Sequence, residues 1–104
     1  MRFYKNLYVS DTVKNVGLVK WKLKHAAGQF DIYLITLSQN EEDQLDIFHN
    51  SMLKQELLRK VDYQVVGIAR GREEALEIVR RITDDCMKQT GTVNIRQYLL
   101  ENFN

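Results

Sequence analysis

The sequence predicts an α+β fold in which one sheet of three or four strands carries helices packed against it. Runs of alternating or continuous apolar residues, typical of strands, occur between segments whose apolar positions repeat with the helical period. The expected order is β-α-β-β-α-β-α-α, and because its first six elements match a ferredoxin-like half, a variant of that fold is one alternative. The chain of 104 residues has no proline and no linker, so we expect one domain spanning residues 1–104.

The chain opens with an expected strand over residues 2–9, where aromatic and aliphatic residues alternate imperfectly with polar ones. Ser10 and Asp11 then offer side-chain oxygens as N-caps for a helix over residues 12–27, which Gly28 is expected to end. A helical wheel gathers the apolar residues of this segment on one face: Val13, Val16, Val19, Leu23, Ala26 and Ala27. This stripe indicates the face that packs on the sheet.

Trp21 lies on the opposite, basic face of the same helix. Its neighbours on the wheel are Lys14, Leu18, Lys22 and His25. A tryptophan among lysines is expected either to be exposed or to be covered by a partner, and large exposed aromatics surrounded by cations are typical of contact surfaces. We therefore expect these five residues to form an interface with Trp21 as its anchor.

The middle of the chain predicts a second strand followed by a hairpin. Residues 30–37 form a nearly continuous β-branched and aromatic run, as expected of a central strand covered on both faces. Ser38 and Glu41 match a helix capping box, yet residues 45–50 alternate like a strand, and we favour a hairpin over a helix here. Residues 51–60 are mostly good helix formers and predict a short helix.

Residues 63–69 predict a second strand of the buried type, in which Gly67 indicates a bulge or close backbone packing. Arg70 and Gly71 form the turn into a strongly patterned helix, with Gly71 expected in the left-handed conformation. One face of this helix carries its apolar residues: Ala75, Ile78, Val79, Ile82 and Cys86. These residues are expected to pack on the sheet.

The patterned helix also predicts an ion pair between Glu77 and Arg81, one turn apart. Thr92 is the expected N-cap of a last short helix that ends near Glu101. The apolar residues of this last segment are Ile95, Leu99 and Phe103. Their spacing indicates one buried face, so both helices are expected to cover the sheet.

The net charge of +1 is distributed unevenly along the chain. Residues 1–30 hold six Lys or Arg against Asp11 alone, and residues 31–57 hold six acids against Lys54, whereas the remainder is nearly balanced. A basic first helix and an acidic segment after it are consistent with complementary contact between copies of the chain. Two independently solvated faces would give the same pattern.

Few side chains are candidates for catalysis. Cys86 lies on an apolar stripe and is expected to be a buried, unreactive thiol. His25 and His49 lack a second His or Cys at ligand spacing, and the acidic residues 41–43 lack the pattern of a calcium loop. An enzyme would need a pocket that joins one of the histidines to a carboxylate. We expect no catalytic residue, no metal and no cofactor.

The turn formed by Arg70, Gly71 and Arg72 is a weaker candidate for a binding site. Helix N-termini beside cations bind phosphate or carboxylate groups. The turn lacks the glycines of a dinucleotide fingerprint and the lysine of a P-loop, and Glu73 and Glu74 compete for the same helix end. An anion site and a plain turn with a self-capped helix are the two interpretations.

Compartment signals are few. No apolar run approaches the roughly 20 residues that a membrane-spanning helix needs. Residues 1–11 lack the apolar core and cleavage site of a signal peptide, and Cys86 is the single cysteine, so no internal disulfide is expected. These features predict a cytoplasmic protein without membrane contact.

Three segments carry a resemblance to a known group: YVSD at residues 8–11, KWKLKHAAGQFDIYLITL at residues 20–37, and YQVVGIA at residues 63–69. Together with the helix that follows the last of them, they look like small uncharacterised proteins of anaerobic Gram-positive bacteria. The resemblance covers most of the chain. It implies a compact bacterial cytoplasmic domain and carries over no functional residue.

The leading functional hypothesis is a non-enzymatic protein-interaction module, either a homodimer or an accessory subunit, that uses the Trp21 face of the first helix. The alternative is binding of nucleic acid or an anionic ligand through the basic first helix or the turn at residues 70–72. For nucleic acid, Tyr4 and Tyr8 would supply a stacking surface on the first strand.

Overall fold

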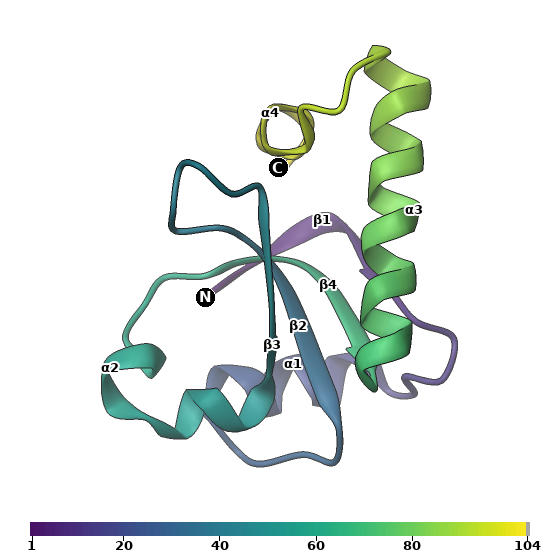
Figure 1. Ribbon diagram of the computed structural model, residues 1–104. Coiled ribbons are helices and arrows are strands. Elements are labelled where there is room, and N and C mark those ends of the chain that lie inside the picture. Colours follow the sequence, from purple (N-terminus) through teal and green to yellow (C-terminus); the bar gives the residue numbers. More distant parts are fainter. Residues whose placement is uncertain (104) are drawn as a thin grey trace.

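Four strands form one mixed sheet in the order β1-β4-β2-β3 (Figure 1). They are β1 (Arg2–Val9), β2 (Ile32–Leu37), β3 (Leu45–His49) and β4 (Gln64–Arg70). β1 runs parallel to β4, whereas β2 is antiparallel to both β4 and β3. The structure is a computed structural model that describes residues 1–103. It confirms the predicted α+β fold with one sheet and the hairpin favoured for β2 and β3.

Helices cover both faces of the sheet (Figure 1). α1 (Val16–Lys24) packs on one face, and α3 (Arg72–Thr90) and α4 (Ile95–Glu101) pack on the other. The connection from β3 to β4 contains a 3-10 helix, η1 (Asn50–Lys54), and the short helix α2 (Glu56–Arg59). This arrangement differs from a ferredoxin-like half, whose helices share one face, because β4 is buried on both sides and needs a layer on each.

The core therefore has two parts, one on each side of β4. Toward α1 the buried residues include Val19 and Leu23 of the helix and Val65 and Ile68 of the strand. Toward α3 and α4 they include Val66, Ala69, Ile78, Ile82, Cys86 and Leu99. The predicted apolar stripes of the helices that follow β1 and β4 thus face the sheet, as their periodicity indicates.

Gly67 lies where the pairing of β4 changes register. Ile35 of β2 pairs with Gly67, and the shift that follows leaves Val66 as an extra residue, which is a β-bulge. A Cβ atom at Gly67 would lie 2.7 Å from Cγ2 of Ile78. The predicted bulge and close packing at Gly67 are both confirmed, and α3 approaches the sheet closely because this position has no side chain.

α1 begins four residues later than predicted from the range 12–27. Asn15, at φ 49°, is its N-cap, and the side-chain oxygen of Asn15 accepts a hydrogen bond from the backbone N–H of Leu18 at 3.2 Å. Ser10 is not available as a cap because its Oγ accepts a hydrogen bond from the backbone N–H of Arg70 on β4. The end of β1 is thereby held to the sheet, and the helix starts only after a turn.

α1 also ends three residues earlier than predicted, and Ala26 rather than Gly28 takes the left-handed conformation, at φ 52°. The backbone N–H of Ala26 donates to the carbonyl of Leu23 at 3.2 Å, and that of Ala27 donates to the carbonyl of Lys22 at 2.9 Å. This pair of bonds is the Schellman motif, which here closes on an alanine.

β2 begins at Ile32, two residues later than the predicted range 30–37. Asp31 interrupts the extended conformation with φ 51°, and its carbonyl accepts a hydrogen bond from the backbone N–H of Gly71 at 2.8 Å. Phe30 consequently lies outside the strand and is 80% exposed. The sequence prediction was wrong for these two residues because the contact that breaks the strand comes from a turn 40 positions away.

Two further local predictions are corrected. The helix predicted over residues 51–60 is divided at Gln55, which is extended between η1 and α2 because the chain turns there toward β4. Asn94, not Thr92, is the N-cap of α4, since its side chain accepts a hydrogen bond from the backbone N–H of Gln97. In both cases the helix-forming segment was identified and its boundary was not.

The ion pair predicted on α3 is also different. Glu77 pairs with Arg80, at 3.6 Å, rather than with Arg81. The guanidinium of Arg81 instead lies over the ring of Tyr8, 5.7 Å from its centroid. Gly71 has φ 81° and ψ 156°, which is not the left-handed helical region but another region open mainly to glycine.

Candidate functional site

The outer face of α1 exposes two large apolar side chains. Trp21 is 55% exposed and Leu18 is 46% exposed, while Val19 and Leu23 of the same helix are buried against the sheet. The predicted exposure of Trp21 is confirmed. We call the five predicted residues the Trp21 surface: Leu18, Trp21 and Lys22 lie on α1 and His25 is its C-cap, whereas Lys14 precedes the helix, contrary to the helical wheel. A solvated helix face rarely needs an indole, so the surface is a candidate contact site.

The indole of Trp21 is held in place by His25, one turn later. The two rings stack with centroids 4.3 Å apart and an angle of 25° between their planes. Nδ1 of His25 lies 2.8 Å from the carbonyl oxygen of Trp21, and the N–H donates there in the tautomer that carries the proton on Nδ1. This bond and the stacked contact hold the imidazole against the indole, which lowers the side-chain freedom that binding would remove.

Lysines surround this surface without acidic partners. α1 contains no acidic residue, and the amines of Lys20 and Lys24 lie over the ring of Phe3, 5.2 and 5.5 Å from its centroid. Lys14 donates to the backbone carbonyl of Asp11 at 3.2 Å. Within residues 1–103, no carboxylate lies within 4.0 Å of any lysine amine on this side of the molecule. The positive charge of the helix is therefore not neutralised internally.

A hollow of about 340 Å³ lies beside the edge strand β3, on the face of the sheet that carries α1. Its lining is mainly apolar and includes Phe48, Met52, Leu58, Val61 and Tyr63, with Asp46 as its acidic residue. We call it the β3 hollow. Sequence reasoning missed it because its walls come from β3, η1, α2 and the segment that follows α2, which only the tertiary fold brings together.

The acidic turn between β2 and β3 is held rigidly by α4. One guanidinium nitrogen of Arg96, Nη2, lies 2.6, 3.1 and 3.0 Å from the carbonyl oxygens of Ser38, Asn40 and Asp43. Oε1 of Gln44 accepts hydrogen bonds from the first two backbone N–H groups of α4. The carboxylates of this turn thus project to solvent from a fixed backbone, and they form the acidic counterpart of the basic α1.

Several donors of Arg70 and Gly71 in the turn at residues 70–72 are already used inside the chain. The backbone N–H of Arg70 donates to Ser10, and its guanidinium donates to the carbonyl of Phe30 at 2.9 Å. The backbone N–H of Gly71 donates to the carbonyl of Asp31. Within residues 1–103, the side chain of Arg72 makes no hydrogen bond or ion pair in this turn. An incoming phosphate would have to displace several of these bonds, so the geometry does not favour this turn as an anion site.

The predicted stacking surface on β1 does not form. Tyr4 is buried between Tyr8 and Phe103, with its ring parallel to that of Tyr8 and 6.3 Å from it. The hydroxyl of Tyr8 donates to Asp85 of α3. Burial, and for Tyr8 also this bond, raises the pKa of both phenols above the usual tyrosine value. Tyr4 and Tyr8 are core and bridging residues, and neither presents a free face to a base.

The histidines and the cysteine lie apart. His49 has Nδ1 2.9 Å from Ser51 and Nε2 3.9 Å from a carboxylate oxygen of Asp31, and Cys86 is buried under α3. Neither His25 nor His49 lines any of the four cavities found. Across residues 1–103, no cluster of three or more metal-ligating side chains occurs. Over the same residues, no helix is both long and apolar enough to cross a membrane.

No protein-family model, curated protein or solved structure matches this chain. Two features of the chain's own geometry are suited to recognition. One is the Trp21 surface, an ordered aromatic side chain surrounded by unneutralised cations. The other is the β3 hollow, an apolar recess with an acidic residue in its wall.

Proposed function

We propose that the chain is a non-enzymatic interaction module that associates with a second copy of itself through the Trp21 surface. The observation that carries this proposal is the 55% exposure of an indole held in one orientation by His25. Tryptophan is the residue most enriched among interface hot spots, and restricting it in advance lowers the entropic cost of burying it. Leu18 beside it extends the apolar area, and Lys14 and Lys22 supply a polar rim.

The second copy is the proposed partner because the chain itself carries a complementary surface. The β3 hollow is apolar enough to take an indole, and Asp46 in its wall matches the cations beside Trp21. In a two-fold dimer each copy would supply one Trp21 surface and one β3 hollow, which makes the contact reciprocal. The opposite charges of residues 1–30 and 31–57 support the same arrangement.

Light scattering on Trp21→Ala tests this proposal, with Phe30→Ala as the matched control. Phe30 is an aromatic side chain 80% exposed, and it lies outside both surfaces. Between about 1 and about 200 µM protein, the wild type and Phe30→Ala should rise from the 12.3 kDa of one chain toward twice that mass. Trp21→Ala should remain a monomer while its circular dichroism stays unchanged.

If the mass of Trp21→Ala rose with concentration as the wild-type mass does, the assignment of this surface to self-association would be wrong. A wild type that is monomeric throughout would overturn self-association. In that case the Trp21 surface would have to serve a different protein, as expected of an accessory subunit.

A charge exchange identifies the receiving surface. Lys22→Glu should weaken self-association by repulsion from Asp46, and Asp46→Lys should weaken it by repulsion from Lys22. Mixing the two variants places the introduced Glu against the introduced Lys at one contact of a two-fold dimer and leaves native Lys22 against native Asp46 at the other, so the mixture should recover the dimer mass. Failure of the mixture to recover, with both variants folded, would show that Lys22 and Asp46 do not meet.

Binding of an anionic polymer is the second candidate, because α1 carries lysines and no acidic residue. Its test is the anisotropy of a labelled single-stranded oligonucleotide titrated at about 50 and about 200 mM salt. Binding through several phosphates should weaken steeply with salt, whereas the Trp21-centred dimer should change much less. The absence of binding at low salt would remove this candidate.

A further inference from the structure

The two neighbouring parallel strands send the chain to opposite faces of the sheet. β1 is followed by α1 on one face, and β4 is followed by α3 on the other. Where adjacent parallel strands diverge in this way, a crevice opens outside their carboxyl ends, and open α/β sheets bind ligands at such points. The topology of this small sheet therefore predicts a ligand-binding crevice at the carboxyl ends of β1 and β4, independently of the side chains there.

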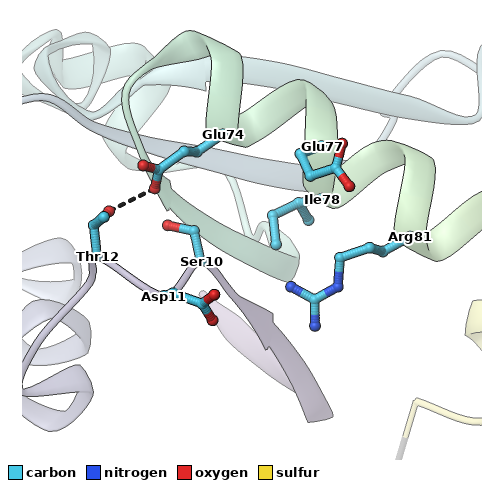
Figure 2. A pocket seen from close by; sticks show the side chains of 7 residues that line it. All are labelled: Ser10, Asp11, Thr12, Glu74, Glu77, Ile78 and Arg81. Carbon is cyan, nitrogen blue, oxygen red and sulfur yellow. Dashed lines mark hydrogen bonds between the residues drawn. The ribbon is translucent and has the colours of Figure 1, made fainter.

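A cavity of about 460 Å³ lies at this end (Figure 2). Ser10, Asp11 and Thr12, just after β1, form one wall. The other wall is the first half of α3, which contributes the following side chains: Glu74, Glu77, Ile78 and Arg81. We call it the β1–α3 cavity. Its volume is within the range of small-molecule sites, and topology and shape point to the same place.

The wall at Glu74 is rigid and carries a negative charge. The hydroxyl of Thr12 donates to the Glu74 carboxylate at 2.5 Å (Figure 2). This bond, followed by one from Ser10, lowers the pKa of Glu74 below the usual glutamate value, so the carboxylate stays ionised. Ser10 is only 7% exposed and is fixed to β4 through Arg70. Asp11 adds a second carboxylate on the same side of the opening (Figure 2).

The opposite side of the cavity holds a cation. Arg81 extends from α3 toward the end of β1, across the opening from Asp11 (Figure 2). Its guanidinium lies over the ring of Tyr8, whose hydroxyl is fixed by Asp85. Within residues 1–103, no carboxylate oxygen lies within 4.0 Å of a nitrogen of Arg81. The guanidinium of Arg81 is thus positioned by an aromatic ring, and its N–H groups can donate to the carboxylate of a ligand.

We propose that the β1–α3 cavity binds a free amino acid, with the ligand's ammonium group between Asp11 and Glu74 and its carboxylate on Arg81. The carboxylates in the lining disfavour a simple anion, and Arg81 disfavours a simple cation. A zwitterion satisfies both sides. Ile78, which is almost fully buried in the core, lines the cavity between them (Figure 2). This site is separate from the Trp21 surface and does not depend on self-association.

Calorimetry and NMR on the full chain test the proposal. The probes are the free L-amino acids, and leucine is compared with 3-methylbutylamine and 4-methylpentanoate, which lack its carboxylate and its ammonium group. We expect at least one amino acid to bind with a dissociation constant below about 1 mM, and its two truncated analogues to bind at least about tenfold more weakly. In the wild type, amide shifts should be confined to residues 10–12 and 74–81.

Matched variants assign the two ends of the ligand. Arg81→Gln should weaken the amino acid about tenfold and leave the amine unchanged, and Glu74→Gln should weaken both. Lys88→Gln, an exposed cation near the end of the same helix, is the control and should bind as the wild type does. The proposal is wrong if no amino acid shifts these amides at 10 mM, if the amine binds as tightly as the amino acid, or if Arg81→Gln binds unchanged.

Discussion

α1 and α3 occupy equivalent places in the fold and differ in how they use their apolar residues. Each follows one of the two parallel strands, and each covers one face of β4. α3 has 19 residues, and its buried positions include Ala75, Ile78 and Ile82. α1 has 9 residues, buries two of them, and leaves the single tryptophan of the chain on its outer side.

The difference is consistent with α3 as a scaffold and with the proposed use of α1 as a contact surface. The buried stripe of α3 lies against the bulge at Gly67, and its exposed side is mostly charged, with Leu76 and Met87 as its exposed apolar residues. α1 contributes fewer buried residues to the core, Val19 and Leu23. Paired changes in the two helices test this division.

The largest difference is expected between the core of α3 and the surface of α1. Ile82 is fully buried, so Ile82→Ala should lower the free energy of unfolding by about 2–5 kcal/mol through lost burial and a residual cavity. Trp21→Ala should cost less than about 1 kcal/mol in the monomer, because the indole packs mainly on His25. Urea unfolding at a dilution where the wild type is monomeric measures both.

Equal losses of stability in these two variants would contradict the division between scaffold and contact surface. Leu18→Ala is the control, since Leu18 is also exposed on α1 and its loss should be as small as that of Trp21.

The next largest loss of stability is expected for the segment that follows α1, which the buried side-chain amide of Asn50 holds by hydrogen bonds. Nδ2 of Asn50 donates to the carbonyls of Gln29 and Ile32 at 3.0 and 2.9 Å, and Oδ1 accepts from the backbone N–H of Gln29. Asn50→Asp keeps the size but leaves two buried carbonyls without donors, so the free energy of unfolding should fall by about 1–3 kcal/mol. Thermal unfolding measures it, and a change within error would mean that water replaces the amide.

Substitutions at the C-termini of the two helices should change the free energy of unfolding by smaller amounts and in opposite directions. α3 ends at Gly91 with φ 72°, and α1 ends at Ala26 with φ 52°. A Cβ at Gly91 would meet no atom within 4 Å, so Gly91→Ala should cost about 1 kcal/mol from backbone strain alone. Ala26→Gly should instead stabilise the protein, by up to about 1 kcal/mol. Chemical unfolding measures both, and changes of the same sign would contradict the assignment of strain to Ala26.

The smallest effect is a pH dependence at the bond that joins the entry of α1 to α3. Thr12→Val removes the hydroxyl that chiefly lowers the pKa of Glu74, so that pKa should rise toward the reference value of 4.5. Because the pKa is depressed in the folded wild type, the stabilisation linked to Glu74 is present above pH 4.5 and is lost as the pH falls through the folded pKa. NMR titration of the Glu74 carboxyl carbon measures the shift, and an unchanged pKa would show that Thr12 does not cause it.

The same comparison explains what the sequence could predict. Helical periodicity is local, so it identified both apolar stripes and placed Trp21 on the outside of α1. The pattern around Gly67 likewise indicated the bulge. The predicted helix and strand boundaries were wrong where a distant residue decides them: Ser10 is hydrogen-bonded to Arg70, and Asp31 is hydrogen-bonded to Gly71.

The candidate sites divide in the same way. The Trp21 surface could be predicted because its five residues lie on one short segment. The β1–α3 cavity could not, because Thr12 and Glu74 are 62 positions apart and meet only after β1 pairs with β4. Tyr4 was misassigned as a stacking residue, since nothing near it in the sequence shows that Phe103 covers it. Signals from side chains far apart in the chain appear only in the fold.

The fluorescence of Trp21 tests the central claim most directly, because it is the single tryptophan of the chain. Emission and acrylamide quenching are recorded while the protein concentration rises from about 0.1 to about 200 µM. If α1 is the contact surface, the emission should shift to shorter wavelength and quenching should fall as Trp21 leaves water. Emission and quenching that stay constant while light scattering shows a dimer would mean that the copies meet elsewhere, and would contradict the account.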